Sequence, residues 1–335
     1  MLKKNVAIPV RAMYPELFGA TARGGADVAG MSEATALQMT MSGNTLNPQA
    51  AELWSVVAEN YEAAFAKKYA DLGVFSHNVE NSFNLPANVR PTIHVEVIET
   101  AGEALTNTTD WEQSALENNY VEVKADRISR PYALNSYDLA SGERWNGKRE
   151  AAIASVLGAV YGKLAAAVKA LAPAAAAAPT KAKVGLLTVG EFGPDYVAET
   201  VSTVFGDYGQ PDALLLSPTL WGAVVPTNAL SLNPETEGVY GIGKLAMSAG
   251  LAGLTTDGKG LGLAAMKSGI AFGAGVPVID SQLGCAVRSL GTICGVPMVL
   301  KVWGKPGSET IYESVETYAG FTVVNARKVA VLAAE

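Results

Sequence analysis

The stretch of this 335-residue chain closest to a catalytic motif is a glycine-rich loop from Gly238 to Leu245. Its spacing of glycines and Lys244 is that of a phosphate-binding loop, in which backbone N–H groups and a lysine hold nucleotide phosphates. The Ser or Thr that would hold magnesium is replaced by Leu245, and no clear strand precedes the loop. We interpret it as a flexible loop, and a nucleotide-binding enzyme that uses Lys244 stays open as an alternative. A second run, residues 258–262, lacks the spacing of a dinucleotide site and is interpreted as a turn.

Other side chains that could do chemistry are scattered along the chain. His77 and His94 lie far apart, and Cys285 and Cys294 have no histidine nearby. Zinc sites and acyl-transfer triads need such groups in clusters. We therefore predict no catalytic, metal-binding or cofactor-binding residue, no cofactor, and a protein that is not an enzyme. The two cysteines are interpreted as buried thiols.

The composition narrows the class of protein. Apolar residues make up 49% of the chain and charged residues 17%, which fits a surface largely covered by neighbouring molecules. The net charge of −7 argues against nonspecific DNA binding, which requires basic surface, so contact with DNA would be confinement. The N-terminal apolar run is too short for a signal peptide, and no apolar run reaches the roughly 18 residues of a membrane helix. We expect a soluble, intracellular protein.

The elements that would position any site begin with a long polar hairpin. Residues 92–99 and 120–128 alternate apolar and polar side chains, as half-covered strands do, and about twenty polar residues separate them. An isolated two-stranded ribbon is marginal in water. We therefore expect this hairpin to rest on another copy of the chain.

A long amphipathic helix is expected after the hairpin. It would run from about residue 147 to 171, with Asn146 as its N-cap. The predicted buried stripe comprises Ile153, Val156, Leu157, Val160, Tyr161, Leu164, Val168 and Leu171. An earlier helix is expected at about 48–72, after an extended arm at 1–46. Strands are expected at 213–216, 276–279, 298–303, 310–316 and 321–324, and the glycine-rich residues 238–275 favour loops and close backbone approach.

Charge is divided between these elements. Residues 91–142 carry nine acids and three bases, whereas residues 143–183 carry seven bases and two acids. An acidic hairpin could therefore lie over the basic helix of a neighbouring copy, which would fix register more than it adds strength. The predicted subunit-interface residues are Glu99, Glu103, Asp110, Trp111 and Glu112 on the hairpin and Lys148, Arg149 and Lys163 on the helix.

The order of these parts resembles the major capsid proteins of tailed bacteriophages, which have the Hong Kong 97-type fold. The resemblance covers roughly residues 90–335 and includes the stretches 212–221, 275–281 and 318–324. It implies an α+β Hong Kong 97-type capsid fold. The N-terminal arm would be 1–90, with a helix at about 48–72, and the extended β-hairpin loop 91–140. The peripheral domain with its long spine helix would be 141–183 and 301–335, and the axial α/β domain 184–300.

The same resemblance implies a function. Copies would assemble into pentamers and hexamers of an icosahedral shell that encloses the double-stranded DNA genome of a tailed phage. The chain's partners would be itself, a portal, and scaffold or decoration proteins, with no membrane, and the shell would form in the host bacterial cytoplasm and remain as the virion capsid. Some relatives carry a covalent lysine–asparagine crosslink, but residues 101–117 contain no lysine, so noncovalent joints are predicted. An encapsulin-like nanocompartment is the alternative with the same fold.

Overall fold

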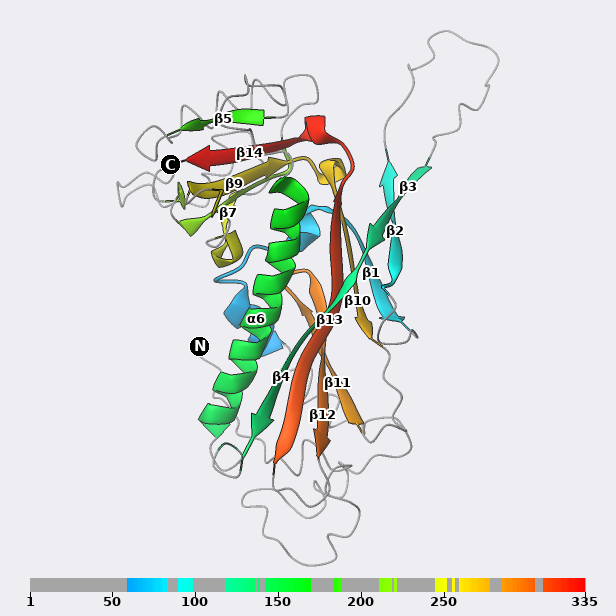
Figure 1. Cartoon of the computed structure of the whole chain (residues 1–335), viewed down its shortest axis with the longest axis vertical. Coiled ribbons are helices and arrows are strands. Elements are labelled where there is room, and N and C mark those ends of the chain that lie inside the picture. Colours follow the sequence, from blue (N-terminus) through cyan, green and yellow to red (C-terminus); the bar gives the residue numbers. More distant parts are fainter. Residues whose placement is uncertain are drawn as a thin grey trace, which may run out of the picture.

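The computed structural model describes residues 59–83, 90–98, 118–135, 138, 142–169, 183–187, 211–218, 220–221, 245–251, 255–256, 259–277, 285–304 and 310–334. These residues form two β-sheets, a two-stranded hairpin and one long helix, so the chain is α+β (Figure 1). The expected arm at 1–46 and the loop around Lys244 lie outside the described residues.

The first sheet has six strands in the order β1-β10-β13-β12-β11, with β4 paired to β13. Its strands are β1 (Ser76–Phe83), β4 (Asp126–Leu134), β10 (Ile270–Pro277), β11 (Cys285–Ile293), β12 (Val296–Gly304) and β13 (Ile311–Val323). β13 is antiparallel to β10, β12 and β4. The prediction of two strands at 310–316 and 321–324 is corrected, because residues 317–320 continue the ladder, with Gly320 paired to Gly273 of β10.

The second sheet has the order β5-β14-β9-β6-β7, with β8 paired to β9. Its strands are β5 (Lys183–Leu187), β6 (Ala213–Leu216), β7 (Leu245–Met247), β8 (Thr255–Thr256), β9 (Lys259–Ala265) and β14 (Val329–Ala334). All four residues of β6 are buried, as predicted for 213–216. The turn expected at 258–262 is wrong from Lys259 onward, because Gly262 pairs with both Leu216 and Leu332 in the middle of the sheet.

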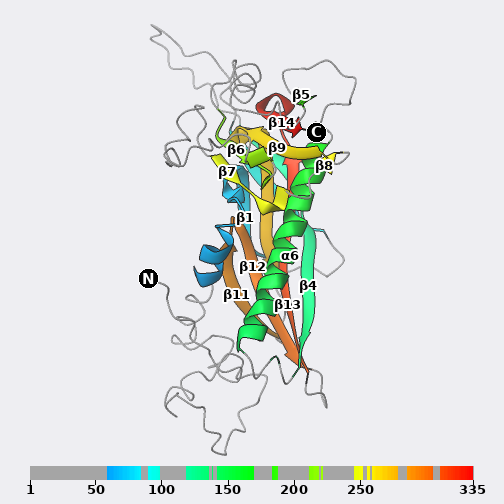
Figure 2. The same cartoon turned by 90° about the vertical axis from the view of Figure 1, so that its left-hand side faces the viewer.

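Helix α6 (Gly142–Lys169) runs along one face of the first sheet and packs on β4 and β13 (Figures 1 and 2). Every described member of the predicted stripe is buried, from Ile153 to Val168. The N-cap prediction is wrong, because the helix begins at Gly142 and Asn146 lies inside it. The stretch Arg144–Val168 meets the length and composition of a membrane-spanning helix, and its apolar face is part of this core.

The helix expected at about 48–72 is described only in its later part. Residues 59–65 are helical, with Tyr61 and Phe65 buried in the core. The chain then turns, and a 3-10 turn, η1 (Leu72–Val74), begins after Asp71, whose side chain accepts a hydrogen bond from the Gly73 N–H. The helix therefore ends earlier than the sequence predicted.

The hairpin consists of β2 (Thr92–Ile98) and β3 (Asn118–Lys124), antiparallel with Thr92 opposite Lys124. The predicted alternation is confirmed, since Ile93, Val95 and Val97 are buried and the residues between them are exposed. The second strand ends before residue 128, because the chain bends at Ala125 and enters the first sheet as β4. The described part of the hairpin packs on β10 and β13 of its own chain, which corrects the expectation that it rests only on another copy.

Each sheet combines strands from the expected peripheral and axial ranges, and the domain ranges themselves stay a prediction. β10 and β11, expected in the axial range 184–300, share a sheet with β13 and β4. β12 crosses residue 300, and β14, from the expected peripheral range, lies in the second sheet. Alternation along a strand predicts that strand's faces but not its pairing partners, so the sequence did not predict this combination.

Candidate subunit interface

The acidic half of the predicted interface lies outside the described residues. That half comprises Glu99, Glu103, Asp110, Trp111 and Glu112. The structure describes the basic half, on α6, together with the β4 residues beside it. The three predicted basic side chains have different surroundings.

Arg149 belongs to a buried charge network between α6 and β13. It is 0% exposed, and its Nη2 donates to Oε1 of Glu313, also 0% exposed, at 2.9 Å. Trp145 Nε1 donates to the same oxygen at 3.1 Å, and the Tyr132 hydroxyl donates to Oε2 at 2.5 Å. The Arg149 guanidinium also lies 4.5 Å from the centroid of the Trp145 ring. Arg149 therefore holds the helix to the sheet, and its side chain does not reach the surface where a second copy would bind.

The tyrosines around this network remain protonated. Burial raises the pKa of Tyr132, and the negative charge of Glu313 raises it further. Burial also raises the pKa of Tyr61, which contacts Arg149. Because Tyr132 keeps its proton, it serves as a hydrogen-bond donor to the Glu313 carboxylate over the physiological pH range.

Lys148, the neighbour of Arg149 in sequence, lies at the edge of the helix. Its Nζ is 2.6 Å from Oδ2 of Asp138 and donates to the Ala133 carbonyl oxygen at 3.0 Å. The hydrogen bond from Lys148 is the main cause that lowers the pKa of Asp138. The Lys148 side chain is 40% exposed and that of Asp138 only 8%.

Lys163 lies farther along the same edge of α6. It pairs with Asp126 of β4, and Asp126 also pairs with Arg90 at 2.7 Å. The Lys163 side chain is 40% exposed, that of Arg90 71% and that of Asp126 22%. In these pairs, as in the Lys148 pair, the cation faces solvent and the carboxylate is covered.

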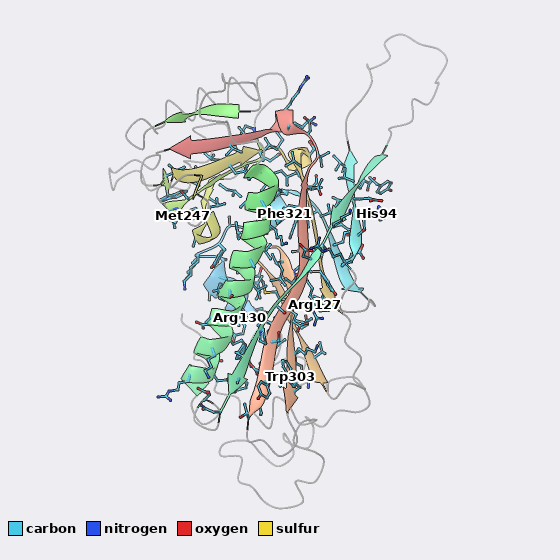
Figure 3. The ribbon with its side chains drawn as sticks, viewed as in Figure 1. His94, Arg127, Arg130, Met247, Trp303 and Phe321 are labelled. Carbon is cyan, nitrogen blue, oxygen red and sulfur yellow. The ribbon has the colours of Figure 1, made fainter. Side chains whose placement is uncertain are left out.

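These pairs give the seam between α6 and β4 a positive outer surface, although the chain as a whole is negative. Exposed Arg130, labelled in Figure 3, and exposed Arg144 add to it. We call this surface the cationic seam, and it comprises Arg90, Arg130, Arg144, Lys148 and Lys163. Arg90 and Arg130 were not among the predicted interface residues. In the charge count, Arg90 precedes the acidic range 91–142 and Arg130 lies within it. Arg130 joins the seam because β4 lies beside α6, and Arg90 joins it because it pairs with Asp126 of β4.

The outer face of the hairpin is polar and uncovered by the described part of the chain. It carries Tyr120, which is 63% exposed, and His94, which lies opposite Glu122. Among the described residues, no group of three or more His, Cys, Asp or Glu side chains could hold a metal ion. Cys294 is a buried thiol, as predicted.

The comparisons with known proteins gave matches among solved structures alone. No family model and no curated protein matches the chain. The capsid of cyanophage P-SCSP1u has a TM-score of 0.42 at 12% identity, covering 95% of this chain and 97% of that one. The virus-like particle from Pyrococcus furiosus has a TM-score of 0.44 at 10% identity, with coverages of 84% and 98%. A structure from Mycobacterium phage Che8 has a TM-score of 0.42 at 12% identity, with coverages of 73% and 85%.

Phage capsid structures are thus among the proteins that this chain resembles. The order of the sequence elements resembled the same class of proteins, the phage capsid proteins.

Proposed function

We propose that this chain is a structural shell protein of the phage major-capsid type, not an enzyme. Copies assemble through pentamers and hexamers into an icosahedral shell around the double-stranded DNA genome of a tailed phage. The observation that carries the proposal is that one chain combines a hairpin of acidic sequence with an outward-facing cationic seam. Two complementary surfaces on one chain allow head-to-tail contacts that close into rings.

Charge supports contact between the hairpin of one copy and the seam of the next. Residues 99–117 contain five acids and no base, and Trp111 lies among them. The seam presents the cations of ion pairs whose carboxylates are already covered. Lys148 and Lys163 stay predicted interface residues, and Arg130 and Arg144 join them. Each exposed pair contributes about 0–1 kcal/mol, so stability comes from repetition over many copies.

The net charge of −7 supports confinement of the genome, not binding of it. A portal, and scaffold or decoration proteins, complete the proposed assembly, which forms in the host bacterial cytoplasm and remains as the virion capsid. An encapsulin-like nanocompartment would use the same subunit contacts around a protein cargo. The contents of purified shells therefore separate the two functions.

The test is negative-stain microscopy of the expressed chain and its neutralised variants. We expect closed shells from the wild type and a large loss of particles from the Lys148→Gln, Lys163→Gln double variant. Glutamine removes the positive charge without placing a new acid beside Asp138 or Asp126. Lys67→Gln, at an exposed position that is not part of the cationic seam, is the control and should assemble normally.

Two results would count against the proposal. One is a wild-type chain that light scattering shows to be a stable monomer at high concentration. The other is normal shell formation by the double variant. Nucleic acid in the purified shells would support the phage capsid, and an enzyme cargo would support the nanocompartment.

A further inference from the structure

We propose that the β2–β3 hairpin is a pre-organised arm, held in one direction by a glycine seat on its own sheet before any second copy binds. The inference extends the proposed assembly function, but it concerns the free subunit. It reverses the expectation that the ribbon gains its order from a neighbour. The described strands of the hairpin lie against β10 and β13 in Figure 1.

The seat is a pair of glycines directly opposite each other in the first sheet, Gly273 on β10 and Gly320 on β13. A Cβ atom at Gly273 would lie 3.0 Å from Cβ of Ile93 and 3.2 Å from Cβ of Val123. A Cβ atom at Gly320 would lie 2.3 Å from the carbonyl oxygen of Lys124. Since real Cβ atoms do not approach backbone that closely, only glycine at position 320 allows the hairpin to lie at this depth.

The part of the hairpin that fills the seat is itself a cross-strand pair. Ile93 and Val123 are opposite each other in the β2–β3 ladder, and both are at most 1% exposed. These two branched side chains lie over Gly273, while the backbone of Lys124 and Ala125 lies over Gly320. Such a fit has one register, because a shift by one residue would turn the apolar side chains to solvent.

Polar contacts fasten the hairpin around the seat. Asn78 Nδ2 donates to the His94 carbonyl oxygen at 2.9 Å, which ties β1 to β2. The Ala125 N–H donates to the Pro91 carbonyl oxygen at 2.9 Å, which closes the base of the hairpin. The ion pair of Arg90 with Asp126 spans the same base. All of these groups belong to one chain.

A seated arm changes how copies would associate. A ribbon that is ordered only on contact loses conformational freedom at that moment, and this loss opposes binding. An arm that already points in one direction avoids most of that loss. The direction it takes would also set the angle at which a neighbouring copy is approached.

The test is amide hydrogen exchange on the unassembled subunit, read in peptides that cover residues 92–98 and 118–124. We expect these amides in the wild type to be protected to the same degree as those of β10. Gly320→Ala should accelerate their exchange by about tenfold or more, the equivalent of overpacking by one methyl group. Gly158→Ala and Gly304→Ala are matched controls, because a Cβ there meets nothing within 4 Å, and their exchange should not change.

A second variant covers the case in which Gly320→Ala fails to fold. Val123→Ala removes two methyl groups from the seat without crowding the sheet, and it should also accelerate exchange in the hairpin peptides alone. Unprotected hairpin amides in the wild-type subunit would overturn the inference, as would unchanged exchange in Val123→Ala. Failure of the proposed function would appear differently, as an absence of shells from a subunit whose hairpin is protected.

Discussion

Replacing Arg149 with methionine should destabilise the subunit far more than the same change at Lys148. Arg149 and Glu313 are both 0% exposed, and Arg149→Met leaves the Glu313 carboxylate buried without its cation. Removal of one partner from a buried ion pair costs about 3–5 kcal/mol in the free energy of unfolding. Trp145 and Tyr132 would still donate to Glu313. They supply hydrogen bonds but no positive charge, so they do not cancel this cost.

Lys148→Met is the matched control, one residue away on the same helix. The Lys148 side chain is 40% exposed, and its partner Asp138 also accepts a hydrogen bond from the Asn135 N–H. Loss of this partly exposed pair should therefore cost no more than about 1 kcal/mol. Neighbours in sequence thus have different roles, one inside the core and one at the surface.

The assay is urea unfolding of the unassembled subunit, followed by circular dichroism and extrapolated linearly to water. With an m-value of about 3 kcal/mol per molar urea, Arg149→Met should lower the midpoint by about 1 M or more. The reasoning is refuted if the two variants unfold within about 0.5 kcal/mol of each other, the spread of ordinary surface substitutions.

Two further predictions test contacts elsewhere in the molecule. The pKa of Asp138 is lower in the folded chain than in the unfolded one, so the unfolded chain binds more protons as the pH falls from about 5 to 3, and stability drops in that window. Asp138→Asn should make urea midpoints fall less steeply as the pH is lowered from 7 to 3, and an unchanged slope would contradict it. Tyr161→Phe removes the hydroxyl that donates to the buried Ala70 carbonyl oxygen at 2.6 Å, and it should cost about 1–3 kcal/mol in urea unfolding. A Tyr161→Phe variant as stable as the wild type would show that water satisfies that carbonyl.

Local patterns in the sequence predicted individual elements well. The three- and four-residue spacing from Ile153 to Val168 predicted α6, and alternation predicted both strands of the hairpin. The start of α6 was missed, because Trp145 hydrogen-bonds a residue far away in the sequence, Glu313, and packing there carries the helix upstream of Asn146. Propensity and capping signals do not record such contacts.

The candidate interface was less predictable than the fold, because position along the chain does not give burial. Lys148 and Arg149 look alike in a charge count, yet one is at the surface and the other is enclosed. The enclosing partner, Glu313, lies in the strand predicted at 310–316, where the sequence pattern does not mark it as buried. The sequence shows that the helix has a basic edge. It does not show that Glu313 pairs with one of these bases, Arg149, inside the core, because that contact exists only in the assembled sheet.

The strand order of both sheets bears on how the chain acquires its structure in time. β13 pairs with β4 across more than 170 residues of sequence, and β14 completes the second sheet beside β9. Neither sheet can be completed until these late segments are available, although local pairs such as β2–β3 and β11–β12 can form earlier. Folding of this subunit should be slow for its size, on the order of milliseconds to seconds or longer, as in other proteins dominated by distant pairings. During that interval, early strands such as β1 and β4 would expose unpaired edges that chaperones could bind.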